Sequence, residues 1–345
     1  MPESRSVTIV GGGLAGLTLG IGLRQRDVPV AVIEAGCYPR HRVCGEFISG
    51  RGLGTLRRLG LYESLIEAGA SVARSVGFCS SRRSCEPRNL PTPALCISRH
   101  LLDELLAREF LRLGGHLRVG ERWHGDRSAE GVVLASGRMP HSGEEGGSWF
   151  GIKIHARNVQ TVADLEMHLF ADGYIGVCKV SPDTVNVCGL FRRRDCGKRT
   201  ACDVRERLSG PRGSLLQQRL AGAQIDESTF CSVAGLSYRP QRVAMQTACC
   251  IGDALTMTPP VTGNGMSMAF EAAELALPPL TAYSEAKLDW PEARHLVAQN
   301  CDAAFTRRLR WAGWLHRLLF VPAVQETLAL KGPLWLWTTL FAKTR

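Results

Sequence analysis

The first part of the chain alternates short apolar runs with a stretch of helical periodicity. Residues 7–10 (VTIV) form a β-branched run that is typical of a buried strand, and residues 30–33 form a second one. Between them, Leu14, Leu17 and Ile21 recur at the spacing of one helix face. A strand, a helix and a second strand in this order predict a parallel α/β unit at the N-terminus.

From residue 149 onward the hydrophobic period changes to two. Residues 151–157, 164–170, 174–180 and 184–191 alternate apolar and polar positions, which predicts an antiparallel sheet in a second domain. Lys153, His155 and Arg157 fall on one face of their strand, interpreted as solvated, with substrate or nicotinamide binding as the alternative. His168 is interpreted as a hydrogen-bonded sheet residue, with a place in the pocket as the alternative.

Three further segments have the pattern of helices. Residues 101–113 carry leucines and a phenylalanine on one side, and another helix is expected to start near Met266 and to end at Pro278-Pro279. From residue 303 onward tryptophans and leucines alternate with arginines, and residues 332–345 are again rich in tryptophan. This basic amphipathic segment predicts C-terminal helices that pack on the body, close a substrate tunnel or lie on an anionic membrane.

Composition limits the classes of function. The 345 residues are 45% apolar and 21% charged, which suits one large or two intimate globular domains. Lys and Arg exceed Asp and Glu by 42 to 32, giving a net charge of +10, but no nucleic-acid-binding motif accompanies this charge. The 13 cysteines form neither CxxC nor a spaced metal quartet, so we expect reduced thiols, no metal and a cytoplasmic protein. No apolar stretch is long enough for a membrane-spanning helix.

The glycine-rich turn GGGLAG at residues 11–16 predicts a dinucleotide site. Gly11 permits the tight turn, Gly13 lets a pyrophosphate approach the backbone, and Gly16 lets helix and strand pack closely. The helix N-terminus adds free N–H groups and the positive end of its dipole. Glu34, at the end of the next strand, can bind a ribose and would repel a 2′-phosphate, so FAD or NAD is expected. The residues expected to hold the nucleotide here are Gly11, Gly13, Leu14, Ala15, Gly16 and Glu34.

A second strand–turn–helix pattern lies near residue 250. The apolar run 248–251 leads to Gly252-Asp253, and a glycine-built turn after two prolines opens a helix. Such a helix N-terminus can stabilise an anionic flavin edge, and Asp253 can bind ribityl or ribose hydroxyls; a structural acid with a glycine turn is the alternative. Two such sites far apart in sequence favour FAD, because its two ends need separate sites. The expected cofactor residues here are Gly252, Asp253, Pro260, Gly263, Asn264, Gly265 and Met266.

Together these motifs resemble the flavoprotein superfamily typified by p-hydroxybenzoate hydroxylase. Within it, the likeness is closest to the branch of geranylgeranyl reductase-like proteins and polyketide-tailoring hydroxylases. It rests on GGGLAG at 11–16, YPRHRVCGEFIS at 38–49, the stretch from residue 97 to 105, and GDA…PPVTGNGMSMAFE at 252–271. The resemblance implies FAD in a Rossmann-type domain, an antiparallel sheet that covers the flavin, and NAD(P)H as a transient electron donor.

The resemblance also implies roles for the segment after the second strand. It places Arg42, Cys44, Gly45 and Glu46 near the isoalloxazine or its ribityl chain, and it assigns Arg99 to FAD. Gly45 would allow a close backbone approach, and Arg42 would offer hydrogen bonds and positive charge. Cys44 has three interpretations: packing beside the flavin, weak proton donation to the substrate, and redox chemistry, for which no cysteine lies at CxxC distance.

We therefore expect an α/β flavoprotein with discontinuous domains. The FAD-binding domain would take residues 1–75, 95–145 and 240–285, the β-rich substrate domain 76–94 and 146–239, and C-terminal helices 286–345. The first hypothesis is an NAD(P)H-dependent monooxygenase acting on a phenolic or polyketide-type hydrophobic substrate, with Cys44 as the candidate catalytic residue. The second is a reductase of isoprenoid double bonds, and the third is a non-catalytic flavin-binding or membrane-associated regulator. The oligomeric state stays open.

Overall fold

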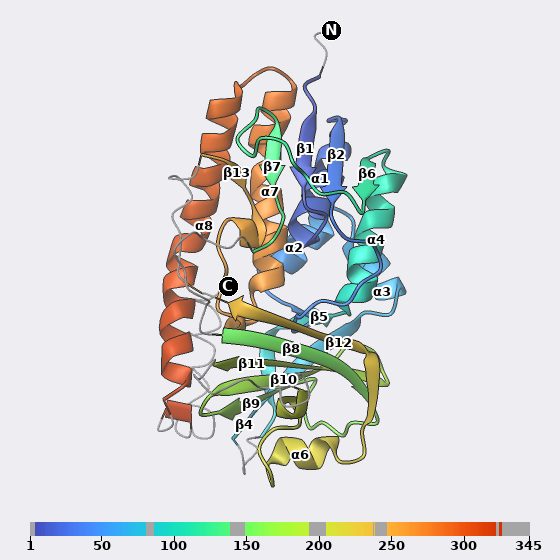
Figure 1. The fold of residues 1–345 in the computed structure, drawn as a ribbon, viewed down its shortest axis with the longest axis vertical. Helices are drawn as coiled ribbons and strands as arrows, with labels where there is room; N and C mark the ends of the chain where they lie inside the picture. The colour runs from blue at the N-terminus through green and yellow to red at the C-terminus, as the bar shows by residue number, and fades with distance from the viewer. Residues whose placement is uncertain are drawn as a thin grey trace.

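The chain forms two sheets, one above the other in Figure 1, with a long helix beside both. This computed structural model describes residues 4–80, 86–138, 149–192, 205–236, 238, 247–321 and 324–325. The tryptophan-rich stretch 332–345, part of the expected C-terminal helices, lies outside the described residues. No helix in the described ranges is long and apolar enough to cross a membrane.

The smaller sheet is parallel and follows the N-terminal pattern. Its five strands lie in the order β13-β7-β1-β2-β6, and β1 pairs with β2 from Val7 with Val30 to Val10 with Ile33. The apolar runs of β1, β2, β7 and β13 are largely buried in the core, as is usual for parallel strands, whereas β6 at the sheet edge is mostly exposed. The strands are β1 (Val7–Val10), β2 (Val30–Glu34), β6 (His116–Val119), β7 (Val132–Leu134) and β13 (Cys249–Cys250).

The larger sheet has eight strands in the order β12-β8-β11-β10-β9-β4-β5-β3, and the expected antiparallel sheet is confirmed. The pairing of β4 with β9 is parallel, in contrast to the other pairs. The strands are β3 (Phe47–Ile48), β4 (Ser71–Cys79), β5 (Arg88–Cys96), β8 (Trp149–Arg157), β9 (Leu165–Phe170), β10 (Gly173–Lys179), β11 (Thr184–Arg192) and β12 (Gln224–Leu236).

Most helices pack around the smaller sheet. Helix α7 contacts α1, α2 and α8, so these segments from distant parts of the sequence share one core. The helices are α1 (Leu14–Arg24), α2 (Arg51–Arg58), α3 (Tyr62–Glu67), α4 (Arg99–Arg112), α6 (Leu215–Leu220), α7 (Gly265–Ser284) and α8 (Trp290–Leu319), with 3₁₀ turns η1 (Arg207–Ser209), η3 (Gly252–Ala254) and η4 (Pro260–Thr262).

The predicted end of α7 at Pro278-Pro279 is wrong, because the helix continues through both prolines to Ser284. A proline inside a helix loses one hydrogen bond and crowds the preceding turn. Here Leu280 and Tyr283, beyond the prolines, are buried in the core with Pro279. Burial of this last turn offsets the local cost, and a reading of the sequence alone does not include that packing.

Helix α8 begins earlier than the basic segment that predicted it. Asp289 accepts a hydrogen bond from Glu292 N, and the Glu292 side chain accepts one from Asp289 N, so a capping box fixes the start. The buried face of α8 enters the core around the smaller sheet near Cys301 and the core of the larger sheet near Leu315. The expected packing with an exposed basic face is confirmed, since Arg307 and Arg310 are exposed.

Candidate functional site

The first glycine turn has the geometry that its sequence predicts. Gly11 has φ +108°, and a Cβ there would lie 2.5 Å from Ala135 O. A Cβ on Gly16 would lie 1.9 Å from Gly11 O, so helix α1 packs too closely on the turn for any side chain. Gly13, by contrast, has nothing within 4 Å of an added Cβ. The protein therefore requires Gly11 and Gly16 for its own packing, whereas Gly13 leaves space for a ligand.

Glu34 stands beside this turn, but its carboxylate already has protein partners. It accepts hydrogen bonds from Gly12 N at 2.8 Å, from Gly36 N at 2.7 Å and from Arg40 Nη1 at 2.7 Å. Burial opposes ionisation, but the hydrogen bonds from Arg40 and the two N–H groups outweigh it and lower the pKa of Glu34 to about 2. A carboxylate has about four lone-pair sites, so one remains for the expected ribose hydroxyl.

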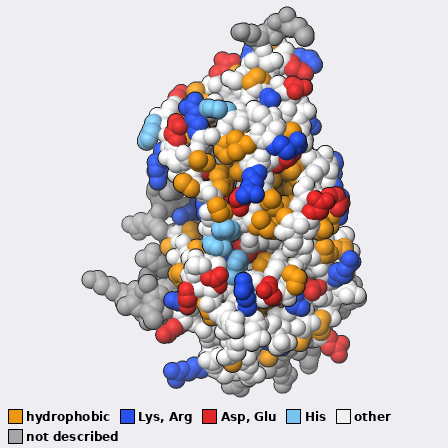
Figure 2. Space-filling view, turned by 90° about the vertical axis from the view of Figure 1, so that its right-hand side faces the viewer, with side chains coloured by type: hydrophobic (Ala, Val, Ile, Leu, Met, Phe, Trp, Pro, Cys, Tyr) orange, Lys and Arg blue, Asp and Glu red, His pale blue; other side chains and the backbone are white. Residues whose placement is uncertain are grey.

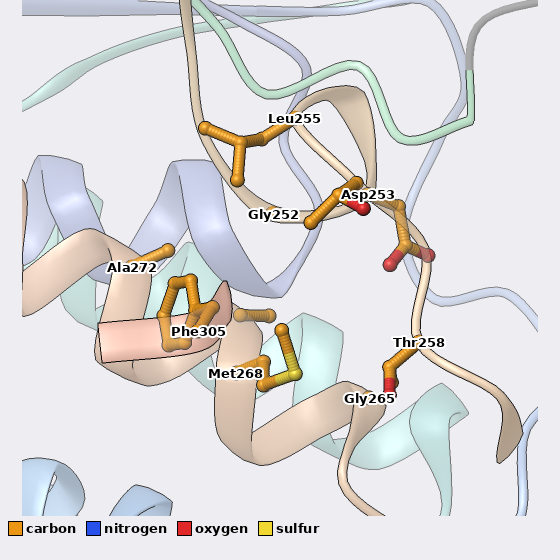
Figure 3. A pocket seen from close by; sticks show the side chains of 10 residues that line it. Gly252, Asp253, Leu255, Thr258, Gly265, Met268, Ala272 and Phe305 are labelled. Carbon is orange, nitrogen blue, oxygen red and sulfur yellow. The ribbon is translucent and has the colours of Figure 1, made fainter. Parts of the chain in front are cut away.

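The second strand–turn–helix pattern begins at β13, an edge strand of the smaller sheet, where Gly252 and Asp253 follow the strand, and its glycine turn opens α7. Figure 3 shows Asp253 with its carboxyl group turned toward Thr258 and away from the apolar side chains of Leu255 and Phe305. A small void of about 10 Å³ lies between this turn and α7. Loss of hydration raises the pKa of Asp253, and the positive charge of Arg99 opposes this rise. Among the described residues no donor forms a hydrogen bond to its carboxyl group, so the ionised form is disfavoured.

Both glycine turns open into one cavity of about 670 Å³, a size typical of ligand pockets. It runs from Gly13 and Glu34, past residues 41–47, to Asp253 and Gly263. Figure 2 shows hydrophobic side chains gathered near the middle of one face of the molecule, with histidine side chains beside them. The cavity brings together most of the residues expected to bind the cofactor: Gly13, Leu14, Ala15, Glu34, Arg42, Cys44, Gly45, Glu46, Arg99, Asp253, Pro260, Gly263, Gly265 and Met266. The expected residues outside its lining are Gly11, Gly16, Gly252 and Asn264.

The shape and the donors of this cavity fit FAD. Added Cβ atoms at Gly13 and Gly45 would meet nothing within 4 Å, so the backbone at both positions borders open space. The N-terminus of α1 meets the cavity at Leu14, and that of α7 meets it at Gly265. Two helix N-termini on one elongated cavity suit a long ligand with negative charge at two places.

The two arginines assigned to FAD share one acidic partner. Arg99 donates from Nε and Nη2 to the Asp103 carboxylate at 2.7 and 2.8 Å, and Arg42 Nε lies 3.6 Å from the same group. Asp103 is fully buried, whereas Arg42 is partly exposed. Two guanidinium groups and one carboxylate leave an excess of one positive charge at the cavity wall, and Asp103 is a member that the sequence reading missed.

Cys44 lines the cavity, as expected, and is partly buried. Burial raises the pKa of the thiol, and the positive charge of Arg99 opposes this effect. Cys188 and Cys231 line the same cavity, on strands β11 and β12. The thiol of Cys44 is thus held in its neutral form, which suits packing or proton donation better than thiolate chemistry.

Glu46 is the centre of a buried charged cluster. Its Oε1 lies 3.2 Å from Lys153 Nζ and accepts a hydrogen bond from Arg99 N, and its Oε2 lies 2.7 Å from His155 Nε2. Lys153 Nζ also lies 3.2 Å from His41 Nδ1. Burial would raise the pKa of Glu46, but the hydrogen bond from His155 and the charge of Lys153 hold it below its usual range.

The interpretation of Lys153 and His155 as residues on a solvated face is wrong. Lys153 is fully buried, and His155 is 6% exposed, whereas Arg157 on the same strand is exposed as expected. This face of β8 turns toward the segment that carries Glu46, so it is covered by protein. The feature of the sequence that could have revealed this burial is Glu46, because an acid in a segment expected to be buried requires a cationic partner.

A separate cluster joins Cys79, Glu166 and His168, whose candidate ligand atoms lie within 4.8 Å of one another. Glu166 already accepts hydrogen bonds from Val162 N and from His168 Nε2, and Arg219 Nε lies 3.4 Å from it. A guanidinium group beside the carboxylate repels a metal cation. The expectation that His168 is a hydrogen-bonded sheet residue is confirmed, and we assign no metal to this cluster.

Comparison with known proteins agrees with this geometry. The family described as an FAD binding domain matches residues 4–159. The structure of the flavin-dependent brominase Bmp2 has a TM-score of 0.77 at 18% identity and covers 98% of this chain and 93% of its own. P. aeruginosa PqsL in complex with 2-aminobenzoylacetate has a TM-score of 0.70 at 16% identity, with coverages of 93% and 98%.

A variant of the halogenase PltM in complex with FAD has a TM-score of 0.70 at 14% identity and covers 91% of this chain and 75% of its own. No curated protein sequence matches the chain. Residues 4–159 therefore match an FAD-binding domain, and the solved structures of flavin-dependent enzymes share the fold of this chain.

Proposed function

We propose that this FAD-dependent enzyme is a monooxygenase that hydroxylates a phenolic or polyketide-type hydrophobic substrate. The observation that carries the proposal is the cavity, whose polar end borders both glycine turns and whose other end is apolar. The apolar end is lined by side chains of the larger sheet and of α8: Phe78, Met167, Leu169, Tyr174, Leu190, Leu236, Leu315 and Leu319. Such a wall excludes water and favours an apolar substrate.

Tyr238 gives this apolar end a polar group. Its hydroxyl lines the cavity region and is a buried oxygen without a hydrogen-bond partner among the described residues. Burial raises the pKa of Tyr238 above its ordinary value, so the hydroxyl stays protonated at neutral pH. A buried polar group without a partner is costly, and an oxygen atom of a phenolic substrate would remove that cost.

Different residues of the chain would bind different parts of FAD. The N–H groups at Gly13, Leu14 and Ala15 would bind the diphosphate of FAD, and Asp253 would bind its ribityl hydroxyls. When bound, FAD supplies the redox chemistry and the activation of oxygen. The excess positive charge of Arg42 and Arg99 over Asp103 would favour negative charge on the cofactor. NAD(P)H would bind only transiently while it reduces the flavin, and it would have no glycine-rich site of its own.

The reductase remains a second candidate because of one residue. Cys44 lines the cavity with its thiol neutral, since burial raises its pKa, and a neutral thiol can donate a proton to a substrate that accepts a hydride. In that case an isoprenoid chain would occupy the apolar end, and Cys44 would act as the proton donor.

One experiment separates the candidates. Purified protein with FAD is supplied with NADPH or NADH and with either an alkylphenol or a geranylgeranyl substrate, in air and without oxygen, and the products are measured by mass spectrometry. We expect one added oxygen atom in the alkylphenol, only in air. A gain of two hydrogen atoms without oxygen would establish the reductase instead. A bound flavin that neither NADPH nor NADH reduces, with either substrate present, would support the non-catalytic regulator.

We also propose that the exposed face of α8 contacts an anionic membrane. Arg307, Arg310, Trp314 and Arg317 recur at intervals of three and four on α8, and all are exposed, as is Val321 just beyond the helix. Basic residues with an interfacial tryptophan favour such a surface. Binding to vesicles with phosphatidylserine but not to neutral vesicles, with loss in the variant Arg307→Glu/Arg310→Glu, is the expected result. Equal sedimentation with both kinds of vesicle would contradict this proposal.

A further inference from the structure

We propose that Lys153, His155 and Asn186 are positioning residues that fasten residues 41–46 to the larger sheet and so fix where this segment meets the flavin. The segment carries Cys44 and Gly45, which border the cavity. The inference rests on the proposed place of the cofactor, but the contacts themselves belong to the protein alone.

Lys153 joins the two ends of the segment. Its Nζ lies 3.2 Å from His41 Nδ1 and 3.2 Å from Glu46 Oε1. The side chain is fully buried, as is that of Glu46, so water does not replace the contact between them. Burial, with the positive charge of Lys153, lowers the pKa of His41 to about 4, which keeps His41 neutral and its Nδ1 able to accept a hydrogen bond. One cation therefore ties together residues that are five positions apart in the chain.

Two further contacts come from the same part of the sheet. His155 Nε2 lies 2.7 Å from Glu46 Oε2, and Asn186 Nδ2 donates to Cys44 O at 2.8 Å. His155 on β8 is directly opposite Asn186 on β11, so the two side chains leave the sheet on one face. The start, the middle and the end of the segment are each held by a side chain of these two neighbouring strands.

The backbone conformation at Glu46 supports the inference that surrounding contacts hold the segment in place. Glu46 has φ +56°, which is uncommon for a residue with a side chain and persists where the surroundings hold it. Glu46 O accepts a hydrogen bond from Ile97 N, and Glu46 Oε1 accepts one from Arg99 N at the start of α4. Glu46 thus connects the larger sheet to a helix of the FAD-binding half.

The opposite side of the segment is open. An added Cβ at Gly45 would meet nothing within 4 Å, and Gly45 and Cys44 line the cavity. The segment is thus held from behind by the sheet that lines the substrate end, while its free side borders the space assigned to FAD. A shift of the sheet would change the distance between this backbone and the flavin.

The test uses Lys153→Met, which keeps the length of the side chain but removes its charge, and Asn186→Ala, which removes one neutral hydrogen bond. The control is Arg157→Met, on the same strand, where the exposed arginine pairs with Asp183 at the surface. Hydrogen–deuterium exchange of the apoprotein is followed in the peptide covering residues 41–48. We expect exchange to accelerate at least about tenfold in the first two variants, because each loses a buried contact whose free energy corresponds to roughly that factor. Exchange should stay unchanged in the control.

The second measurement is the visible spectrum of bound flavin. A change of position beside the isoalloxazine should shift its absorption bands in Asn186→Ala, whereas the control keeps the wild-type spectrum. Unchanged exchange in residues 41–48 of Asn186→Ala would overturn the inference, and this variant decides the matter even if Lys153→Met does not fold. If the wild-type protein fails to bind FAD, the proposed function fails, while the exchange measurement still judges the fastening of the segment.

Discussion

Replacement of Gly13 by valine separates ligand binding from folding. Gly13 has φ −85° and ψ −168°, an extended conformation that any residue adopts, and its added Cβ meets no protein atom within 4 Å. The change should cost the fold about 1 kcal/mol or less, the size of a helix N-cap effect. The new side chain would instead occupy the space next to the first N–H groups of α1.

The loss of FAD affinity can be worked out from those groups. A hydrogen bond to a charged group contributes about 1.5–3 kcal/mol. If valine prevents two such bonds to the diphosphate, binding weakens by about 3–6 kcal/mol, or roughly 10² to 10⁴-fold. We expect Gly13→Val to be purified as a colourless, folded protein.

The assay is the FAD dissociation constant, measured from flavin fluorescence, together with the melting temperature by circular dichroism. Gly16→Ala is the control, because its Cβ would lie 1.9 Å from Gly11 O and must disturb the fold itself. The control should melt at a lower temperature, whereas Gly13→Val should melt close to the wild type. Wild-type FAD affinity in Gly13→Val would refute the assignment of this turn to the diphosphate.

Further outcomes follow for four sites. Asp253→Ala should purify without FAD, and full retention of flavin would count against its role at the ribityl chain. Cys44→Ser should keep FAD but change turnover; unchanged kcat and KM would leave packing as its role. For Glu34 the folded pKa of about 2 lies below the ordinary 4.5, so its contribution to stability, up to about 3 kcal/mol, is complete above pH 4.5 and is lost as the pH falls toward 2. Urea unfolding at several pH values should therefore show a shallower acid loss in Glu34→Gln than in the wild type. Arg308→Met should lower the free energy of unfolding by about 3–5 kcal/mol, since it leaves Glu271 buried without its paired cation; a loss below 1 kcal/mol would contradict this.

The sequence predicted the elements whose patterns are local. The strands around Gly11 and the start of α7 follow from runs of apolar residues and from glycine, because backbone geometry at a tight turn restricts the residue type. The alternating pattern from residue 149 likewise predicted the larger sheet. These features depend on neighbours along the chain.

What the sequence could not predict depends on neighbours across the fold. The period of two predicted that Lys153 and His155 lie on one face of their strand. It did not predict that this face is covered, because the covering segment lies about a hundred residues away in the sequence. Asp103 differs, because its bidentate pair with Arg99 lies four positions along α4, a local spacing that the sequence reading missed; only its approach to Arg42 depends on the fold. The end of α7 was misjudged because burial of its last turn outweighs two prolines.

Helix α8 has a mechanical consequence. Its 30 residues are embedded near one end in the core of the smaller sheet and near the other in the core of the larger sheet. A helix anchored in both cores restricts hinge motion between the two sheets, so calorimetry should record a single cooperative melting transition rather than two.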